Sequence, residues 1–481
     1  MLMILNKRIA AVPSFPGLRR FPQGRGFKQW TGDDSKALMK VYLPAIVGIV
    51  PTSMIHAIAA FMEFCYIMRR SVIDEQDLQE AETALARFEQ YRSVFQLSGV
   101  RPNGFSLPRM HALQHYLHHV REFGAPNGLC SSITEAKHIK AIKEPWRRSS
   151  RFEALKQMLL TNQRLDKLAA SHVDFEARGM LEGTCLSAAL ANLLSRNDDN
   201  DNDDDSDDDD DDDSSSGLVP PSVNDEQGPT ARRPNDTFAA MKDQGPTPGP
   251  LSLSSVLLAS CPVRGVPKDF QHLAEHYALG ALPILASRFL YEQLHPEIED
   301  VLAIPAYDLP ILTTCRIQVF NSAIATFHAP SDPSGIGGMH HERVRATPSW
   351  RRSYPRHDCV FVSTGPERGM RGMHAARICL FFSFRYQERT YPCALVEWFV
   401  RIDDLPDADT GMWIVEPEFN NAEERVTSVI HIDTIVRSAH LIPVYGDTMI
   451  SSTFHFSDSL DAFSTYYVNK YADHHAFEIA F

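Results

Sequence analysis

Six basic residues and one tryptophan gather between positions 123 and 151, where a loop of glycine, proline and asparagine leads into a short helical segment. The basic side chains are Lys137, Lys140, Lys143, Arg147, Arg148 and Arg151, and Trp146 lies among them. Such cations contact nucleic-acid phosphates, and an indole ring stacks on bases or sugars. The segment therefore predicts DNA binding. A solvated helix face with Trp146 in the core fits the same residues equally well. We expect Pro145 to end the helix.

Glu135 precedes this basic segment and is the candidate catalytic and metal-binding residue. A carboxylate beside cations could hold a divalent metal ion against a DNA phosphate. The order Ser132-Ile-Thr-Glu135 is also a capping box, in which the glutamate bonds back to the start of its helix. From the residues alone, capping is the favoured interpretation.

Two further patterns could carry chemistry. His111, His115, His118 and His119 have helical spacing that can place two imidazoles on one metal ion, although solvent-exposed histidines are the favoured interpretation. A second basic and aromatic stretch could contact nucleic acid, but an exposed connection between strands is favoured; it comprises Arg343, Arg345, Trp350, Arg351, Arg352 and Arg356. His431 and Asp433 fall in an expected strand and are interpreted as structural. The sequence contains no phosphate-binding glycine loop, nucleophile elbow or H-E-x-x-H pattern.

The elements that position these residues are helical over 1–195, where apolar residues recur with a period near 3.6. Helices are expected at about 34–42, 52–69, 74–95, 107–122 and 150–170, after an irregular basic segment at 11–32. Asp33 or Asp34 is expected to cap the first of them. The last should turn five residues inward: Phe152, Leu155, Leu159, Leu165 and Leu168.

Charge is distributed unevenly along the chain. The net charge is −14, and thirteen aspartates lie between Asp198 and Asp213. Residues 1–182 hold 25 basic and 17 acidic residues, whereas the remainder holds 22 and 44. A basic half beside an acidic tract is typical of a nucleic-acid binder with a solvating linker. Residues 196–250 have low complexity and too little apolar surface to fold, which predicts a disordered linker.

The third part, 251–481, is expected to be an α+β domain. Helices are expected at 268–296, and from about 311 short apolar runs separated by Asp, Pro and Gly predict a small barrel or sandwich. The runs are 315–320, 358–362, 377–384, 391–399, 411–415 and 428–432. None of the eight cysteines forms a C-x-x-C pair, which argues against zinc ribbons. The apolar stretch 41–67 is interrupted by Pro44, Pro51 and Glu63, so two buried helices explain it better than a membrane span.

Several long strings resemble Plavaka-type transposases of fungal mobile elements, which are related to the Kyakuja-Dileera-Zisupton and CACTA-like groups. The first is FPGLRRFPQGRGFKQWTGDDSKALMKVYLP at 15–44. Others are FSLPR at 105–109, the Glu135 window, TNQRLDKLA at 161–169, and the segments 391–399 and 431–445. The resemblance covers nearly the whole chain except the acidic tract.

The resemblance implies that 1–195 is a remnant of an RNase H-like core, in which three carboxylates hold two Mg²⁺ ions, with Glu135 as the third. The family's first two aspartates would precede its Pro/Gly/Arg segment, which here begins almost at Met1. We therefore expect a truncated, catalytically incomplete, nuclear DNA-binding protein that holds no metal cofactor alone. Asp33, Asp34, Asp74 and Asp77 are the upstream carboxylates that could assist Glu135. An active DDE-type transposase, if the chain belongs to a longer protein, and a chromatin or protein-interaction module are the alternatives. Self-association and an SH3-like or BAH-like C-terminal barrel are further expectations.

Overall fold

The computed structural model describes residues 2–26, 30–129, 138–178, 254–298, 300–332, 338–350, 352–451 and 453–480. The chain forms two compact units. The first combines Met1–Asn127 with Ala231–Phe481, and the second is Gly128–Thr230. The expected boundaries at 195 and 250 therefore differ from these units, because the N-terminal helices belong to the same body as the C-terminal strands. The whole of the predicted linker, 196–250, lies outside the described residues.

Helices make up the N-terminal part of the first unit, as periodicity predicts. They are α1 (Leu2–Ala10), α2 (Gly32–Ile46), α3 (Thr52–Ile67), α4 (Glu75–Tyr91), α5 (Ser93–Leu97), α6 (Pro108–Ala112), the 3₁₀ turn η1 (Leu113–His115), α7 (Tyr116–Phe123) and α8 (Pro126–Leu129). Helices α1 and α8 were not predicted, since nine and four residues are too few to show a clear pattern.

Helices α2 and α4 begin with reciprocal capping boxes. Thr31 caps α2: its hydroxyl accepts the Asp34 N–H, while the Asp34 carboxylate accepts the Thr31 N–H at 2.9 Å. The expectation that Asp33 or Asp34 is the cap is therefore wrong by two or three residues, because Thr31 is the N-cap and Asp34 is the N3 partner of the same capping box. Asp74 and Asp77 form the same arrangement at α4.

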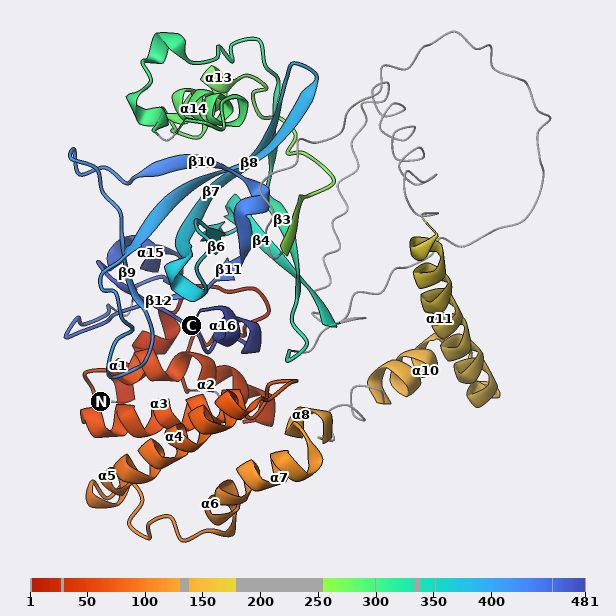
Figure 1. The fold of residues 1–481 in the computed structure, drawn as a ribbon, viewed down its shortest axis with the longest axis vertical. Coiled ribbons are helices and arrows are strands. Elements are labelled where there is room, and N and C mark those ends of the chain that lie inside the picture. Colours follow the sequence, from red (N-terminus) through yellow and green to blue (C-terminus); the bar gives the residue numbers. More distant parts are fainter. Residues whose placement is uncertain are drawn as a thin grey trace. The chain divides into compact units, whose positions relative to one another are not determined.

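The C-terminal part is built on antiparallel strands, which confirms the α+β layout. They are β1 (Ser254–Leu258), β2 (Ile317–Phe320), β3 (Ser322–His328), β4 (Met339–Trp350), β5 (Tyr354–His357), β6 (Cys359–Ser363), β7 (Met373–Tyr386), β8 (Arg389–Arg401), β9 (Ile414–Pro417), β10 (Thr427–His431), β11 (Ile435–Ala439), β12 (Leu441–Pro443) and β13 (Tyr466–Val468). The larger sheet has the order β11-β6-β7-β8-β9-β13-β12, with β10 on β8 and β2 on β7. The smaller sheet runs β1-β3-β4-β5. Together the strands curve into a nearly barrel-shaped sheet (Figure 1).

The long β7–β8 hairpin is the centre of this sheet. Its two-residue turn, Gln387 and Glu388, has positive φ at both positions, which is the geometry that matches the twist of the flanking strands. A bulge between Ile378 and Leu380 bends β7 and adds curvature. All six strand runs expected from the sequence fall on β2 and β6–β10.

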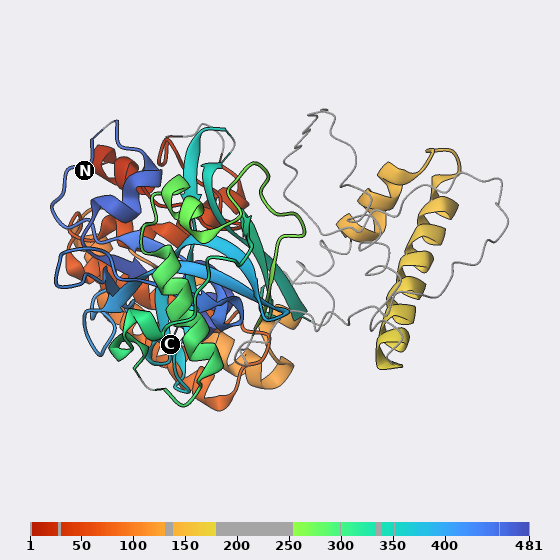
Figure 2. The same ribbon diagram turned by 90° about the horizontal axis from the view of Figure 1, so that it is seen from above.

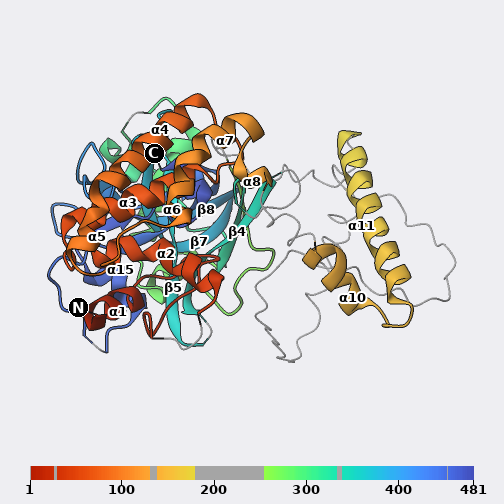
Figure 3. The ribbon, with the colours of Figure 1, turned by 90° about the horizontal axis from the view of Figure 1, so that it is seen from below.

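Helices cover two regions of the sheet. Helices α13 (Phe270–His276) and α14 (Leu282–Leu294) pack on apolar side chains of β2, β7 and β8 at one end (Figure 2). The N-terminal helices cover the other end (Figure 3). Short helical segments complete the unit: η3 (Val301–Ala303), η4 (Ala306–Asp308), η6 (Gly369–Arg371), η7 (Ile432–Thr434), η8 (Phe456–Asp458), α15 (Ser459–Ala462) and α16 (His474–Ile479).

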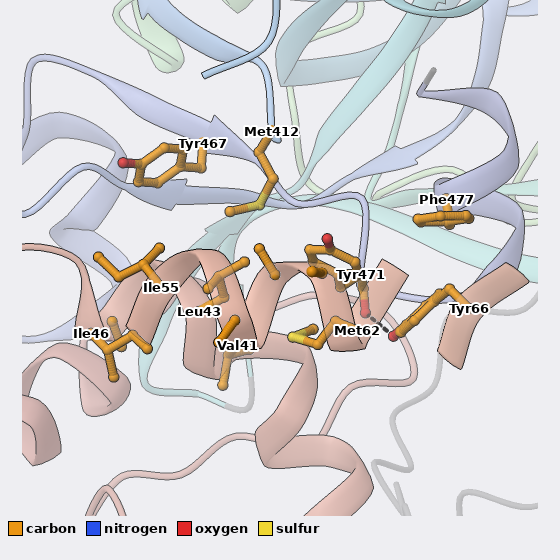
Figure 4. Close-up of a cluster of buried hydrophobic side chains, with 14 of the residues drawn as sticks. Val41, Leu43, Ile46, Ile55, Met62, Tyr66, Met412, Tyr467, Tyr471 and Phe477 are labelled. Atoms are coloured by element: carbon orange, nitrogen blue, oxygen red, sulfur yellow. Dashed lines mark hydrogen bonds between the residues drawn. The ribbon is translucent and has the colours of Figure 1, made fainter. Parts of the chain in front are cut away.

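One hydrophobic core joins the N-terminal helices to the C-terminal segments (Figure 4). Leu43 and Ile55 pack in the same cluster as Met412, Tyr467 and Phe477. Several hydrogen bonds cross the junction, and two of them come from buried tyrosines. The Tyr66 hydroxyl donates to the Tyr471 carbonyl at 2.6 Å, and the Tyr445 hydroxyl donates to the Arg8 carbonyl at 2.8 Å. Burial of these side chains together is what makes residues 1–127 and the strands a single body.

Candidate nucleic-acid interface

The second unit carries the basic segment on a continuous helical stretch. A π-helical turn, η2 (Ile139–Lys143), runs directly into α10 (Glu144–Arg148), and α11 (Ala154–Ala177) follows. Pro145 therefore lies inside the helical stretch, and the prediction that it ends the helix is wrong. An α-helical bond to the Ala141 carbonyl would need an N–H at position 145, which proline lacks. The Asn162 side chain of α11 donates to that carbonyl instead, at 2.8 Å.

The basic side chains of this stretch face solvent. Lys143, Arg147, Arg148 and Arg151 are exposed, and within residues 138–178 none of them forms an ion pair. Residues 138–156 contain six basic and two acidic residues. The excess of positive charge is therefore not neutralised by neighbouring side chains in the described part of this unit, and it is available to phosphates.

Trp146 lies among these cations with 45% of its surface exposed. The interpretation that places it in the core is therefore wrong, because a core indole is nearly fully covered. An exposed ring flanked by arginines can stack on a base or sugar while the cations contact the backbone.

The turn after α10 fixes the position of Arg151. Both Arg151 and Glu153 have left-handed backbone conformations, with φ of 65° and 45°. Gln157 holds the turn together: its amide donates to the Phe152 carbonyl at 2.6 Å and accepts the Ser150 N–H at 3.0 Å. The sequence contains no glycine here that would have signalled this conformation.

Three residues of the predicted site are described in part or not at all. Glu135 and Lys137 lie outside the described residues. The structure therefore tests neither the capping box nor the metal-ligand interpretation of Glu135. Lys140 belongs to the π-helical turn, and its side chain lies outside the described set.

The upstream carboxylates that could assist Glu135 already have structural partners. Asp34 is buried, closes the α2 capping box and pairs with Arg19. Asp77 closes the α4 box and pairs with Arg70. Asp33 is exposed beside Lys36. Within the described part of the chain, no three His, Cys, Asp or Glu side chains come together as a metal site.

Most of the second basic and aromatic stretch lies in strands β4 and β5, and the expected exposed connection is confined to the turn that contains Arg352. The Arg345 guanidinium lies 3.8 Å from the centroid of the Trp350 ring, and Arg356 lies 5.3 Å from it. Arg356 also donates two hydrogen bonds to Asp358, at 2.8 and 3.2 Å. Arg345 and Arg356 are thus engaged within the fold, whereas Arg147 and Arg148 of α10 have no acidic partner in the described part of their unit. His431 is buried, and its Nδ1 accepts the Asp433 N–H, which confirms its structural role.

A buried ionic cluster around Arg437 was not found from the sequence. Arg437 donates two hydrogen bonds to Asp473, at 2.7 and 2.6 Å, and one to Glu342 at 3.4 Å. Burial raises the pKa of Glu342 to about 7, against the attraction of Arg437. Asp473 also caps α16 by accepting the Ala476 N–H. The cluster joins strands β4 and β11 to the C-terminal helix.

Searches with the whole chain find no matching family model, no matching curated protein and no matching solved structure. Among the described helices, none combines the length and the apolar character needed to cross a membrane. The geometry of the basic segment is therefore the main basis for assigning a function.

Proposed function

We propose that this protein binds DNA with little sequence preference, through the basic face formed by Lys143, Trp146, Arg147, Arg148 and Arg151. One observation carries the proposal: a half-exposed indole stands among exposed cations that have no acidic partner in the described part of their unit. Phosphate contacts would supply most of the affinity, and ring stacking would add to it.

The resemblance to Plavaka-type transposases supports a mobile-element origin and a nuclear location. On this proposal the N-terminal helices derive from an RNase H-like core, and the curved C-terminal sheet is related to SH3-like or BAH-like barrels. On this proposal, intact members of the family bind Mg²⁺ through three carboxylates, and this chain does not bind it alone. The capping and ion-pairing of Asp34 and Asp77 support a catalytically incomplete chain, because these carboxylates are not available to a metal ion.

Salt-dependent binding to a duplex oligonucleotide tests the proposal. Each phosphate contact contributes about −0.9 to the slope of log K against log salt. Replacing Arg147 and Arg148 by alanine should therefore flatten the slope by roughly two. The matched control is the Arg368→Ala/Arg371→Ala variant, which removes the same charge from an exposed part of the first unit and should leave the slope nearly unchanged.

Equal slopes for the wild type and the Arg147/Arg148 variant would show that the basic face is a solvated surface that does not contact DNA. Mg²⁺-dependent nicking that disappears in Glu135→Ala would instead favour the active-transposase alternative.

The second candidate function, a protein-interaction module, is favoured by exposed leucines on α11. Leu155 and Leu168 are each 69% exposed, although apolar residues at this spacing usually face a partner. If the protein does not bind DNA, sedimentation at several protein concentrations would show whether this unit mediates self-association instead.

A further inference from the structure

The segment 108–123 presents its histidines on the side opposite its apolar face. Leu113 and Leu117 pack against the first core, and Val120 is buried in it. His111, His115, His118 and His119 are all exposed. The apolar residues thus leave one solvent-facing row of imidazoles.

Polar contacts with α4 hold this segment in place. The Gln114 amide donates to Glu89 at 3.1 Å. The Arg121 guanidinium donates to both carboxylate oxygens of Glu75, at 2.9 and 3.3 Å. Because each anchor lies near one of the histidines along the chain, the backbone that carries the imidazoles is fixed on a packed element. A fixed backbone reduces the conformational entropy that the binding residues lose when a ligand binds.

Two of the imidazoles meet at a distance that a metal ion requires. The Nε2 atoms of His111 and His115 lie 3.3 Å apart, and their rings are nearly perpendicular. Two nitrogens bound at about 2.0–2.1 Å to a tetrahedral Zn²⁺ ion lie about 3.3–3.4 Å from each other. Their i, i+4 separation is also the one by which helices supply two histidines to zinc.

We propose that His111 and His115 form an open, two-histidine site for Zn²⁺ or a similar late transition-metal ion. Solvent would complete the coordination, since no third ligating side chain joins a metal-binding group among the described residues. Imidazole nitrogens select such ions over Mg²⁺ and Ca²⁺, which prefer oxygen. The site consists of residues of the first unit, whereas the basic face belongs to the second, and the proposal does not depend on DNA binding.

Zinc titration of the full chain, with any affinity tag removed, tests the site by calorimetry. One Zn²⁺ should bind per chain, and Mg²⁺ at the same concentration should not. The His111→Gln/His115→Gln variant should lose affinity by about tenfold or more, because removal of even an outer partner of a metal ligand costs that much. The His118→Gln/His119→Gln variant is the matched control from the same segment and should bind within about twofold of the wild type.

Co²⁺ gives a second readout that does not depend on overall stability. Its absorption spectrum should show nitrogen coordination in the wild type and in the control variant, and not in the His111/His115 variant. All four imidazoles are exposed, so circular dichroism of the metal-free variants should match the wild type. Zinc affinity that survives loss of His111 and His115, or falls equally in the control, would overturn the assignment.

Discussion

Arg437 is a charged side chain placed where water does not reach, with 1% of its surface exposed. Burial would raise the pKa of Asp473, but the attraction and hydrogen bonds of Arg437 outweigh it and hold that pKa well below its usual value. The guanidinium also lies over the Phe327 ring, 4.6 Å from its centroid. Each buried charge in this cluster therefore depends on its partner for stability.

Asp473→Asn should destabilise the first unit by about 3–5 kcal/mol, because it leaves the Arg437 charge buried with only the more distant Glu342. Urea unfolding followed by circular dichroism measures the change. Glu75→Gln removes an exposed carboxylate from a two-bond pair with Arg121 and serves as the control. It should have a much smaller effect, since water replaces the lost bonds. Similar effects of the two substitutions would show that the buried cluster does not stabilise the fold.

At the scale of elements, a proline inside a helix needs a substitute donor for the carbonyl one turn earlier. Here the substitute comes from another helix: Asn162 on α11 donates to the Ala141 carbonyl. The π-helical turn before Pro145 widens the backbone, as the bond from the Glu144 N–H to the Ile139 carbonyl shows. The π-helical turn η2 and helix α11 are thus joined through a hydrogen bond to the carbonyl that the proline leaves without its helical donor.

A double-mutant cycle tests this relation between Pro145 and Asn162. In the wild type, Asn162→Ala should destabilise residues 138–178 by about 1 kcal/mol, because it leaves the Ala141 carbonyl without that donor. In a Pro145→Ala background the new N–H can serve the carbonyl, so the same change should cost less, with a coupling of about 0.5–1 kcal/mol. Hydrogen exchange of peptides in this range gives both values. Gln163→Ala, on the exposed side of α11, is the control, and additive effects of the two mutations would exclude the relation.

Periodicity predicted helices such as α3 and α4, and runs of apolar residues predicted strands such as β7 and β8. These patterns missed seven strands: β1, β3, β4, β5, β11, β12 and β13. The last two have three residues each and are buried throughout, so they show no alternation. Strand β4 is twelve residues long, but its sequence is rich in polar and charged residues and forms no apolar run. Periodicity also turned Phe152, Leu155, Leu159, Leu165 and Leu168 inward, whereas all five are exposed. A 3.6-residue period shows that a helix has an apolar face, but it does not show that another element covers that face.

The candidate interface could be predicted only in part for a similar reason. Composition identified the cations and Trp146, since charge and an aromatic ring are visible in the sequence. Exposure of Trp146 could not be predicted, because a tryptophan between basic residues fits a core position and a surface position equally well. The bond from Asn162 that keeps the helix intact past Pro145 joins residues that only folding brings together.

At the scale of the whole first unit, residues far apart in the sequence share one interior. Three histidines lie near this junction, and burial is the main cause that lowers the pKa of His440 to about 4, His474 to about 4 and His475 to about 3. His440 is held on both ring nitrogens: the Asn469 amide lies 3.0 Å from Nδ1, and Nε2 lies 3.3 Å from the Pro13 carbonyl. The neutral imidazole, with Nδ1 accepting and Nε2 donating, satisfies both contacts. A protonated ring would place a second N–H against the Asn469 amide.

This arrangement predicts that the first unit loses stability in mild acid. The pKa of His440 is lower in the folded chain than the ordinary value of about 6.5, so the unfolded chain takes up the proton first as the pH falls. The contribution of His440 is therefore complete above about pH 6.5 and is lost as the pH falls toward 4. The raised pKa of Glu342 has the opposite effect on the free energy of unfolding: between about pH 4.5 and 7 the folded chain binds this proton more readily than the unfolded chain. Glu342 therefore offsets the pH dependence that one of the three histidines contributes.

His440→Gln should make the free energy of unfolding depend less on pH, since glutamine cannot bind the proton but can still donate to Pro13 and accept from Asn469. Between about pH 4.5 and 6 the slope should fall by up to about 1.4 kcal/mol per pH unit, the contribution of one proton. Urea unfolding across this range measures the slope separately from any constant loss of stability. His118→Gln, at an exposed histidine, is the control for removal of an imidazole as such. A slope in His440→Gln equal to that of the wild type would mean that His440 is not held neutral at the junction, and that the acid sensitivity arises from other groups.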